Sequence, residues 1–136
     1  MTDAEYAAQK KRLVRLKDRW YAALGLGWWR IEETYYREGG EGFAPPEGSS
    51  WGSLATCVAD WSHKAASISW NMPAVAETDD YVLETAYVHE MMHLFVSEMR
   101  EGVVADFNQL PHEERVCTQL AEAFLWTRTA GSKDKK

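Results

Sequence analysis

Cysteine and long apolar runs are both scarce in this chain of 136 residues. Neither Cys57 nor Cys117 belongs to a CxxC pair, which excludes a metal finger built on such pairs. We expect both to be reduced, half-buried small side chains, with a single disulfide between them as the alternative. No apolar run approaches the roughly 20 residues of a transmembrane helix, and the polar N-terminal segment contains no secretory signal. These absences predict a soluble, cytoplasmic protein without a membrane partner.

The chain also has fewer positively than negatively charged residues. The formal net charge is −6, whereas non-specific binding to nucleic acid or to an anionic membrane requires a positive surface. We therefore expect neither of these as a partner. Basic residues crowd only the segment from Lys10 to Arg19. We interpret this segment as the solvated face of a helix, with a partner-binding or nucleic-acid surface as the alternative.

The length fits one domain spanning residues 1–136. A domain of this size buries roughly two-thirds of the surface that its unfolded chain exposes, so it needs no metal or disulfide merely to hold its core. The 7 tryptophans are expected as core material rather than as a surface for stacking nucleic-acid bases. Acidic charge and the alternating patterns around them favour this interpretation.

Periodicity divides the first half of the chain into a helix and three strands. Thr2 and Glu5 have the spacing of a capping box, and apolar residues then recur at helical intervals up to a glycine-rich stop. Alternation of apolar and polar residues predicts the strands, the last two of which are separated by a tight turn at Ser62-His63. The expected ranges are helix 2–24, strand 28–37, loop 38–50, strand 53–61 and strand 64–70.

The second half is predicted to be helical. Thr78, Asp79 and Asp80 supply a cap and an acidic first turn for a helix over residues 79–99. Pro111 suits the first position of a helix over residues 111–129, followed by a polar, frayed tail at residues 131–136. The whole pattern predicts an α+β fold. In it an N-terminal helix and a small, mostly antiparallel sheet of three or four strands pack against the two later helices.

The first of these later helices contains an HExxH motif, His89-Glu90-Met91-Met92-His93. Residues four apart lie on one helix face, so both imidazoles can reach one ion. Glu90 points to the side of the metal, where it is placed to accept a proton from water and deliver it to a leaving amine. Imidazole ligands, with no need for redox chemistry, favour Zn²⁺. A random ordering of this composition contains HExxH on the order of once in a hundred, so we expect a metal site rather than two structural histidines.

HExxH supplies two ligands, and a peptidase metal site needs a third from the protein. The sixth residue after His93 is Met99 rather than histidine, which excludes the metzincin spacing. The downstream candidates are Asp106, His112, Glu113, Glu114 and Glu122.

Helical periodicity narrows these candidates without choosing one. Glu122 falls on the polar face of the last helix, and Asp106 falls in a connection where it suits a turn. Glu113 and Glu114 both fall within the apolar arc of that helix, Glu113 nearer its centre, whereas His112 falls outside it. Acidic residues in a first turn also complement the helix dipole, so either glutamate has a structural explanation. His112, Glu113 and Glu114 therefore stay open.

The segment from Tyr81 to Phe124 resembles the small HExxH metallopeptidases of phages and bacteria, the minimal gluzincin-like group that includes the ImmA/IrrE family. That family takes its third ligand from a glutamate that opens the following helix, in a pattern like ExxANxFA. Glu114 begins the matching run ERVCTQLA, in which Thr118 replaces the asparagine. The resemblance implies Glu114 as the third ligand, a zincin-like fold, and the cytoplasm of a bacterium or a phage-infected host cell. In such folds an edge strand beside the metal helix binds the substrate backbone by strand addition, and residues 64–70 are the expected strand.

A second resemblance is to the SprT-like proteases. The run YVHEMMHLFV, which begins at Tyr87, and the two-strand segment before it are similar to those enzymes. That family takes a third histidine shortly after the HExxH helix, which implies His112 as the alternative ligand. Glu113 follows His112, where the SprT-like pattern has glycine.

These patterns together predict a zinc-dependent peptidase that hydrolyses a protein or peptide substrate. His89, His93 and Glu114 would hold Zn²⁺, and Glu90 would act as the general base. One alternative is a zincin-like regulatory or interaction module that binds a regulatory protein without proteolysis, against which the intact Glu90 argues. The other is a SprT-like, DNA-associated protease, against which the absence of a basic tail and of a further set of cysteines argues.

Overall fold

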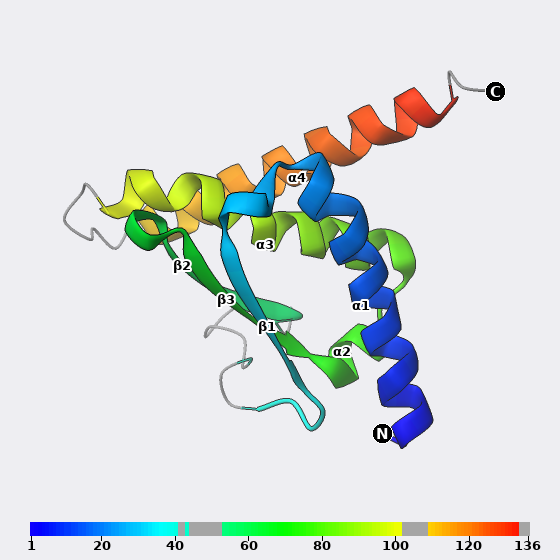
Figure 1. Cartoon of the computed structure of the whole chain (residues 1–136). Coiled ribbons are helices and arrows are strands. Elements are labelled where there is room, and N and C mark those ends of the chain that lie inside the picture. The colour runs from blue at the N-terminus through cyan, green and yellow to red at the C-terminus, as the bar shows by residue number, and fades with distance from the viewer. Residues whose placement is uncertain (41–42, 44–52, 102–108, 134–136) are drawn as a thin grey trace.

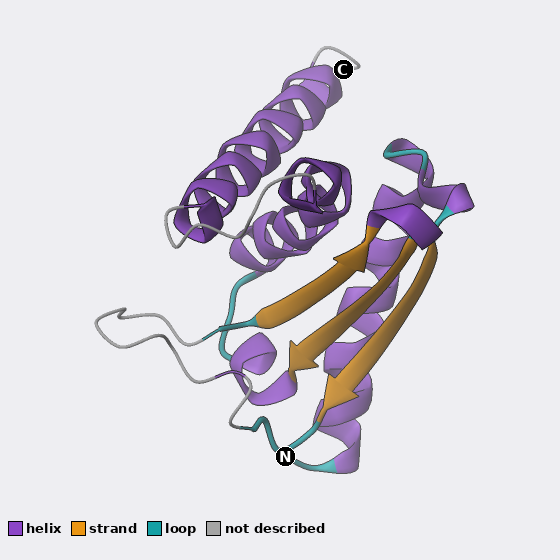
Figure 2. Cartoon of the chain, turned by 90° about the vertical axis from the view of Figure 1, so that its left-hand side faces the viewer, coloured by secondary structure: helices purple, strands orange, loops and turns teal. Residues whose placement is uncertain are grey.

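A computed structural model gives the structure of the chain and describes residues 1–40, 43, 53–101 and 109–133. Within these ranges the coarse α+β class is confirmed. Helices α1 and α3 cover one face of a small sheet, and α4 packs along α3 (Figures 1 and 2). The elements are α1 (Asp3–Ala23), β1 (Arg30–Tyr36), β2 (Ala55–Asp60), β3 (Ala65–Asn71), α2 (Met72–Ala76), α3 (Asp80–Glu101) and α4 (Gln109–Lys133), with short 3₁₀ turns at Leu26–Trp28 and Trp61–His63.

Helix α1 begins with the expected capping box. The Thr2 hydroxyl accepts a hydrogen bond from the Glu5 N–H at 3.1 Å, and the Glu5 carboxylate accepts one from the Thr2 N–H at 2.6 Å. Two of the otherwise unsatisfied donors at the helix start are thereby paired. The helix buries a stripe of apolar residues and ends before Gly25, whose φ of 67° is the left-handed conformation that glycine adopts readily. The buried residues of the stripe are Leu13, Leu16 and Trp20.

The sheet is mixed, and its strand order corrects the expectation of a mostly antiparallel sheet. The order of the three described strands is β1-β3-β2, with β1 parallel and β2 antiparallel to the central β3. The edge strand expected at residues 64–70 is therefore wrong, because β3 is hydrogen-bonded on both sides. Alternation predicts which residues share a face, but it contains no information on which strands are neighbours.

One face of the sheet carries the core. Ala66, Ile68 and Trp70 on β3 are buried, as the alternation predicts, whereas Ser67 on the opposite face is exposed. Tyr87 of α3 stacks on Trp70, with ring centroids 5.3 Å apart and planes 7° from parallel. This contact seats the middle of α3 on the sheet, just before the HExxH motif.

Three expectations for element boundaries need correction. Asn71-Met72-Pro73 not only ends a strand but starts the short helix α2, in which proline occupies the first turn and Met72 is fully buried. Helix α4 begins at Gln109, before Pro111, and continues to Lys133. Residues 131–133 of the expected tail are therefore helical, and residues 134–136 lie outside the described part of the chain. Most of the expected loop, at residues 41–42 and 44–50, also lies outside it.

The tryptophans divide between the core and the surface. Trp20 and Trp70 are buried as expected, at 3% and 0% exposure. Trp28, Trp61 and Trp126 are 85%, 39% and 76% exposed, so the expectation that they pack in the core is wrong. Sequence spacing does not distinguish these cases, because an aromatic residue suits the core and the surface equally on a short amphipathic stripe.

The basic segment of α1 is largely occupied by contacts within the chain. Arg12 forms an ion pair with Asp80 at 2.7 Å and also donates to the Val75 carbonyl at 3.0 Å. Lys10 and Lys17 lie over tyrosine rings. The segment is thus partly a contact surface for the rest of the fold rather than a fully solvated face.

Of the two free cysteines, Cys57 is half-buried as expected, whereas Cys117 is fully buried. Both lie in the described part of the chain, and no disulfide joins them. None of the helices that the structure describes has the length and apolarity needed to span a bilayer.

Candidate metal centre

The HExxH motif on α3 packs against the first turns of α4. The two helices run antiparallel and pack along each other (Figure 1). Cys117 and Ala121 on α4 are both fully buried in this interface. Their small side chains let the helix backbones approach closely, so that an acidic residue near the start of α4 reaches the imidazoles of α3.

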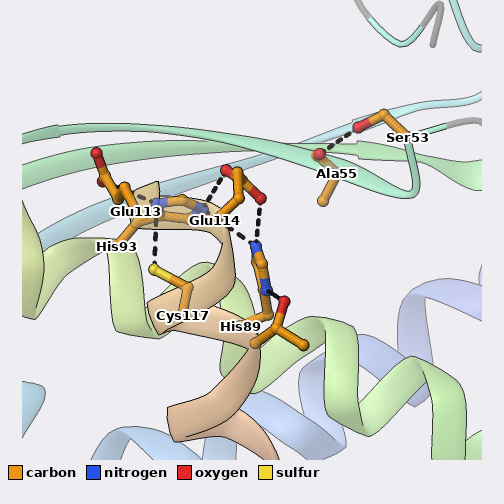
Figure 3. A network of polar contacts seen from close by, with 8 residues as sticks. Ser53, Ala55, His89, His93, Glu113, Glu114 and Cys117 are labelled. Carbon is orange, nitrogen blue, oxygen red and sulfur yellow. Dashed lines mark hydrogen bonds and ion pairs between the residues drawn. The ribbon is translucent and has the colours of Figure 1, made fainter. Parts of the chain in front are cut away.

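His89, His93 and Glu114 form a compact triangle of ligand atoms (Figure 3). The Nε2 atom of His89 lies 2.9 Å from one carboxylate oxygen of Glu114, and the Nε2 atom of His93 lies 3.0 Å from the other. The two Nε2 atoms are 3.2 Å apart. Three of the residues expected in the site therefore meet at one point, from two helices.

The three side chains could hold one metal ion between them. Ligand bonds of about 2.0–2.1 Å place the donors of a tetrahedral zinc site about 3.3 Å from one another. Here the two Nε2 atoms are 3.2 Å apart, and each lies 2.9–3.0 Å from a different oxygen of Glu114, so that one donor atom from each residue lies within 4.8 Å of the others. Two imidazoles whose nitrogens face each other need a proton or a cation between them, since their lone pairs otherwise repel. Two imidazoles and one carboxylate are also a donor set that suits Zn²⁺.

A surrounding layer of contacts orients the two imidazoles. The Nδ1 atom of His93 lies 3.0 Å from a Glu113 oxygen and 3.5 Å from the Cys117 sulfur (Figure 3). The Nδ1 atom of His89 lies 3.1 Å from the Thr118 hydroxyl. If each Nδ1 carries the proton and donates it to these acceptors, each Nε2 lone pair faces the centre of the triangle.

Glu90 is buried beside the cluster, with 8% of its surface exposed. Burial raises the pKa of its carboxyl above the ordinary value, whereas the neighbouring imidazoles of His89 and His93 act in the opposite direction. The Glu90 carboxyl is therefore a buried acid next to the two histidines of the motif.

The remaining ionisable groups of the cluster favour positive charge at its centre. Hydrogen bonds from His89 and His93 hold the pKa of the Glu114 carboxyl well below its usual range. Burial by itself lowers the pKa of His93. Hydrogen bonds to Cys117, Glu114 and Glu113 outweigh burial and raise this pKa to about 11. Without a metal the cluster thus retains a proton, which a bound cation would displace.

The other candidates for the third ligand lie elsewhere. His112 is exposed, and its Nδ1 atom lies 3.4 Å from a nitrogen of Arg115 rather than near the cluster. Glu122 is exposed on the polar face of α4, as periodicity predicts. Asp106 lies outside the described residues. Glu113 reaches the outer nitrogen of His93, and among the described candidates Glu114 alone reaches both inner nitrogens.

Thr118, which replaces asparagine in the ExxANxFA-like pattern, contacts His89 although no motif marks it for that role. Its position one turn after Glu114 is the usable signal, because residues four apart share a helix face. Sequence patterns indicate Cys117 only as a small residue, although its sulfur also lies against His93.

Comparison of the chain with family models, with curated proteins and with solved structures found no match to any of them.

Proposed function

We propose that this chain is a zinc-dependent peptidase, with His89, His93 and Glu114 as metal ligands and Glu90 as the general base. The observation that supports the proposal most is the cluster of two Nε2 atoms, 3.2 Å apart, and the Glu114 carboxylate, whose two oxygens lie 2.9 and 3.0 Å from them. The motif, its position inside α3 and the burial of Glu90 support the same chemistry. The proposal includes a zincin-like fold of the minimal gluzincin type.

The chain's own residues account for proton transfer. A bound Zn²⁺ supplies Lewis acidity, which polarises a peptide carbonyl and lowers the pKa of water. Glu90, adjacent to His89 in the motif and buried beside the ligands, takes a proton from the attacking water. It then returns this proton to the leaving amine. Glu113 and Thr118 hold the imidazoles in the orientation that this chemistry requires.

Strand β2 is the element that we propose for binding the substrate backbone. It is an edge strand, since its only sheet neighbour in the described chain is β3, and it packs beside α3. Val58 on this strand is 72% exposed. An open edge next to the metal helix suits an extended peptide added by backbone hydrogen bonds. This replaces the expectation that residues 64–70 serve that role.

Metal analysis combined with peptide cleavage tests the proposal. We expect about one zinc per chain in the purified protein, and loss of tight binding in His93→Ala. Glu90→Gln should retain the metal and the fold but lose cleavage by at least about 100-fold, because it removes only the base.

Two results would contradict the assignment. Full zinc occupancy in the double variant His89→Ala/His93→Ala would remove the metal centre. Zinc binding without cleavage of any peptide or protein, in wild type and Glu90→Gln alike, would indicate the binding module considered above instead of a peptidase.

A further inference from the structure

A groove runs between the N-terminal half of α3 and the C-terminal half of α4. Its volume is about 640 Å³, within the range of sites that hold a peptide side chain or a small ligand. Figure 1 shows the C-terminal half of α4 diverging from α3 in this region. The residues that matter for its chemistry are Tyr81 and Thr85 from α3, and Gln119, Glu122, Leu125 and Trp126 from α4.

The groove lies on the same pair of helices as the metal centre. Thr85 precedes His89 by one helical turn on α3. On α4, Gln119 directly follows Thr118, whose hydroxyl lies 3.1 Å from the Nδ1 atom of His89. The near end of the groove therefore begins about one turn from the ligands, and its length follows the two helices away from them.

The far end of the groove is aromatic and the rim is acidic. Tyr81 and Trp126 are 66% and 76% exposed, whereas Leu125 between the helices is only 4% exposed. Glu122 is exposed on the rim. The nearby Arg128 is turned away, forming an ion pair with Glu84 at 3.1 Å. Among the described lining residues none carries a positive charge.

We propose that this groove binds one flank of the peptide substrate and takes an aromatic side chain between Tyr81 and Trp126. The inference rests on the proposed peptidase function. Tyr81 lies a little over two turns, or about 12 Å, from His89 along the helix axis. An extended peptide advances about 3.3 Å per residue, so the aromatic side chain belongs to the third or fourth residue from the scissile bond. A basic residue beside it faces Glu122.

The dimensions of the groove favour a peptide segment over a second copy of the chain. Stable interfaces between proteins bury about 1,200–2,000 Å² around an apolar centre. Besides the two exposed aromatic rings, the groove is lined by polar Thr85, Gln119, Glu122 and Thr129 and by apolar Ala123 and Leu125, all from two helices. Such a surface matches one chain segment with one large apolar side chain.

Peptide scanning with a matched pair of variants tests the inference. A phenylalanine is moved along each flank of an otherwise small-residue peptide, and kcat/KM is measured for each peptide. Phenylalanine at the third or fourth position on one flank should raise kcat/KM by about 3- to 10-fold, the range that aromatic contacts supply. Trp126→Ala should abolish this preference. Trp28→Ala, which removes another tryptophan that is 85% exposed, should retain it.

Binding to the Glu90→Gln variant provides a readout that does not depend on cleavage. Titration calorimetry should show the same positional preference in affinity, and adding Trp126→Ala should remove it. Equal affinities with and without Trp126→Ala would overturn the inference even if the enzyme cleaves peptides. A wild-type dimer that dissociates in Trp126→Ala, with unchanged peptide preference, would also overturn it and assign the groove to a second copy. Absence of cleavage in every peptide would contradict the proposed function alone.

Discussion

At the residue scale, two adjacent glutamates serve opposite sides of one imidazole. Glu114 lies 3.0 Å from the Nε2 atom of His93, and Glu113 lies 3.0 Å from its Nδ1 atom. Consecutive residues on a helix point about 100° apart, so Glu113 and Glu114 contact different nitrogens of the His93 ring. The side chain of Glu114 is 53% exposed, as suits a ligand at an open site, whereas that of Glu113 is 9% exposed.

This division predicts an order of effects on zinc affinity. Glu114→Ala should weaken binding most, because it removes a direct donor. Glu113→Gln should weaken it by roughly 10- to 100-fold, since an orienting acceptor with full negative charge is lost. His112→Ala is the matched control on the same helix turn and should leave the affinity unchanged. Competition with a chelator measures all three, and the absorption spectrum of the Co²⁺-substituted protein reports the ligand geometry.

A larger loss in Glu113→Gln than in Glu114→Ala would reverse the roles of the two carboxylates. A large loss in His112→Ala would instead favour the histidine ligand that the SprT-like resemblance implies.

At the element scale, the Glu33 carboxylate on β1 is hydrogen-bonded to side chains of α1, β3 and α3. Glu33 accepts hydrogen bonds from the Trp70 Nε1–H at 2.9 Å, from the Tyr21 hydroxyl at 3.0 Å and from the Tyr87 hydroxyl at 3.2 Å. The three donors come from three different elements, and Tyr87 lies on α3 just before the HExxH motif. The contact network therefore supports the helix that carries the candidate site.

Glu33→Gln should lower the free energy of unfolding by about 1–3 kcal/mol. The amide nitrogen cannot accept, so at least one partly buried donor loses its partner. Urea denaturation measures the change, and Glu32→Gln on the exposed face of the same strand is the control. A change no larger than that of the control would show that the network contributes little to stability.

At the scale of the whole molecule, the same network predicts sensitivity to alkaline pH. Burial, followed by the negative charge of Glu33, raises the pKa of Tyr35 to about 12. The same two causes raise the pKa of Tyr21 and of Tyr87. The unfolded chain releases these protons near pH 10, whereas the folded chain retains them. The stability that these three protonated tyrosines contribute is therefore fully present below about pH 10 and is lost as the pH rises toward 12.

The urea midpoint should fall steadily between pH 9 and pH 11.5. Tyr21→Phe should flatten this dependence, because one of the retained protons is removed, whatever its effect on the midpoint at neutral pH. Identical midpoints across the range would mean that the tyrosines ionise equally well in the folded chain.

Much of the helical structure could be predicted from local sequence. The capping box at Thr2, the cap before α3 and the shared face of His89 and His93 depend only on the geometry of one helix. The buried face of β3 follows from alternation in the same way. These features were anticipated because each is decided by residues within a few positions of one another.

The tertiary structure decided the features that join distant segments. Parallel pairing of β1 with β3 depends on how the chain crosses between them, and periodicity does not specify that path. The approach of Glu114 to the two imidazoles depends on how α4 packs on α3, which places Glu113 and Glu114 on different nitrogens of His93. The 76% exposure of Trp126 on α4 depends on how that helix packs beside α3. Each of these depends on packing between elements, whereas a periodic sequence pattern reports only the geometry of one element at a time.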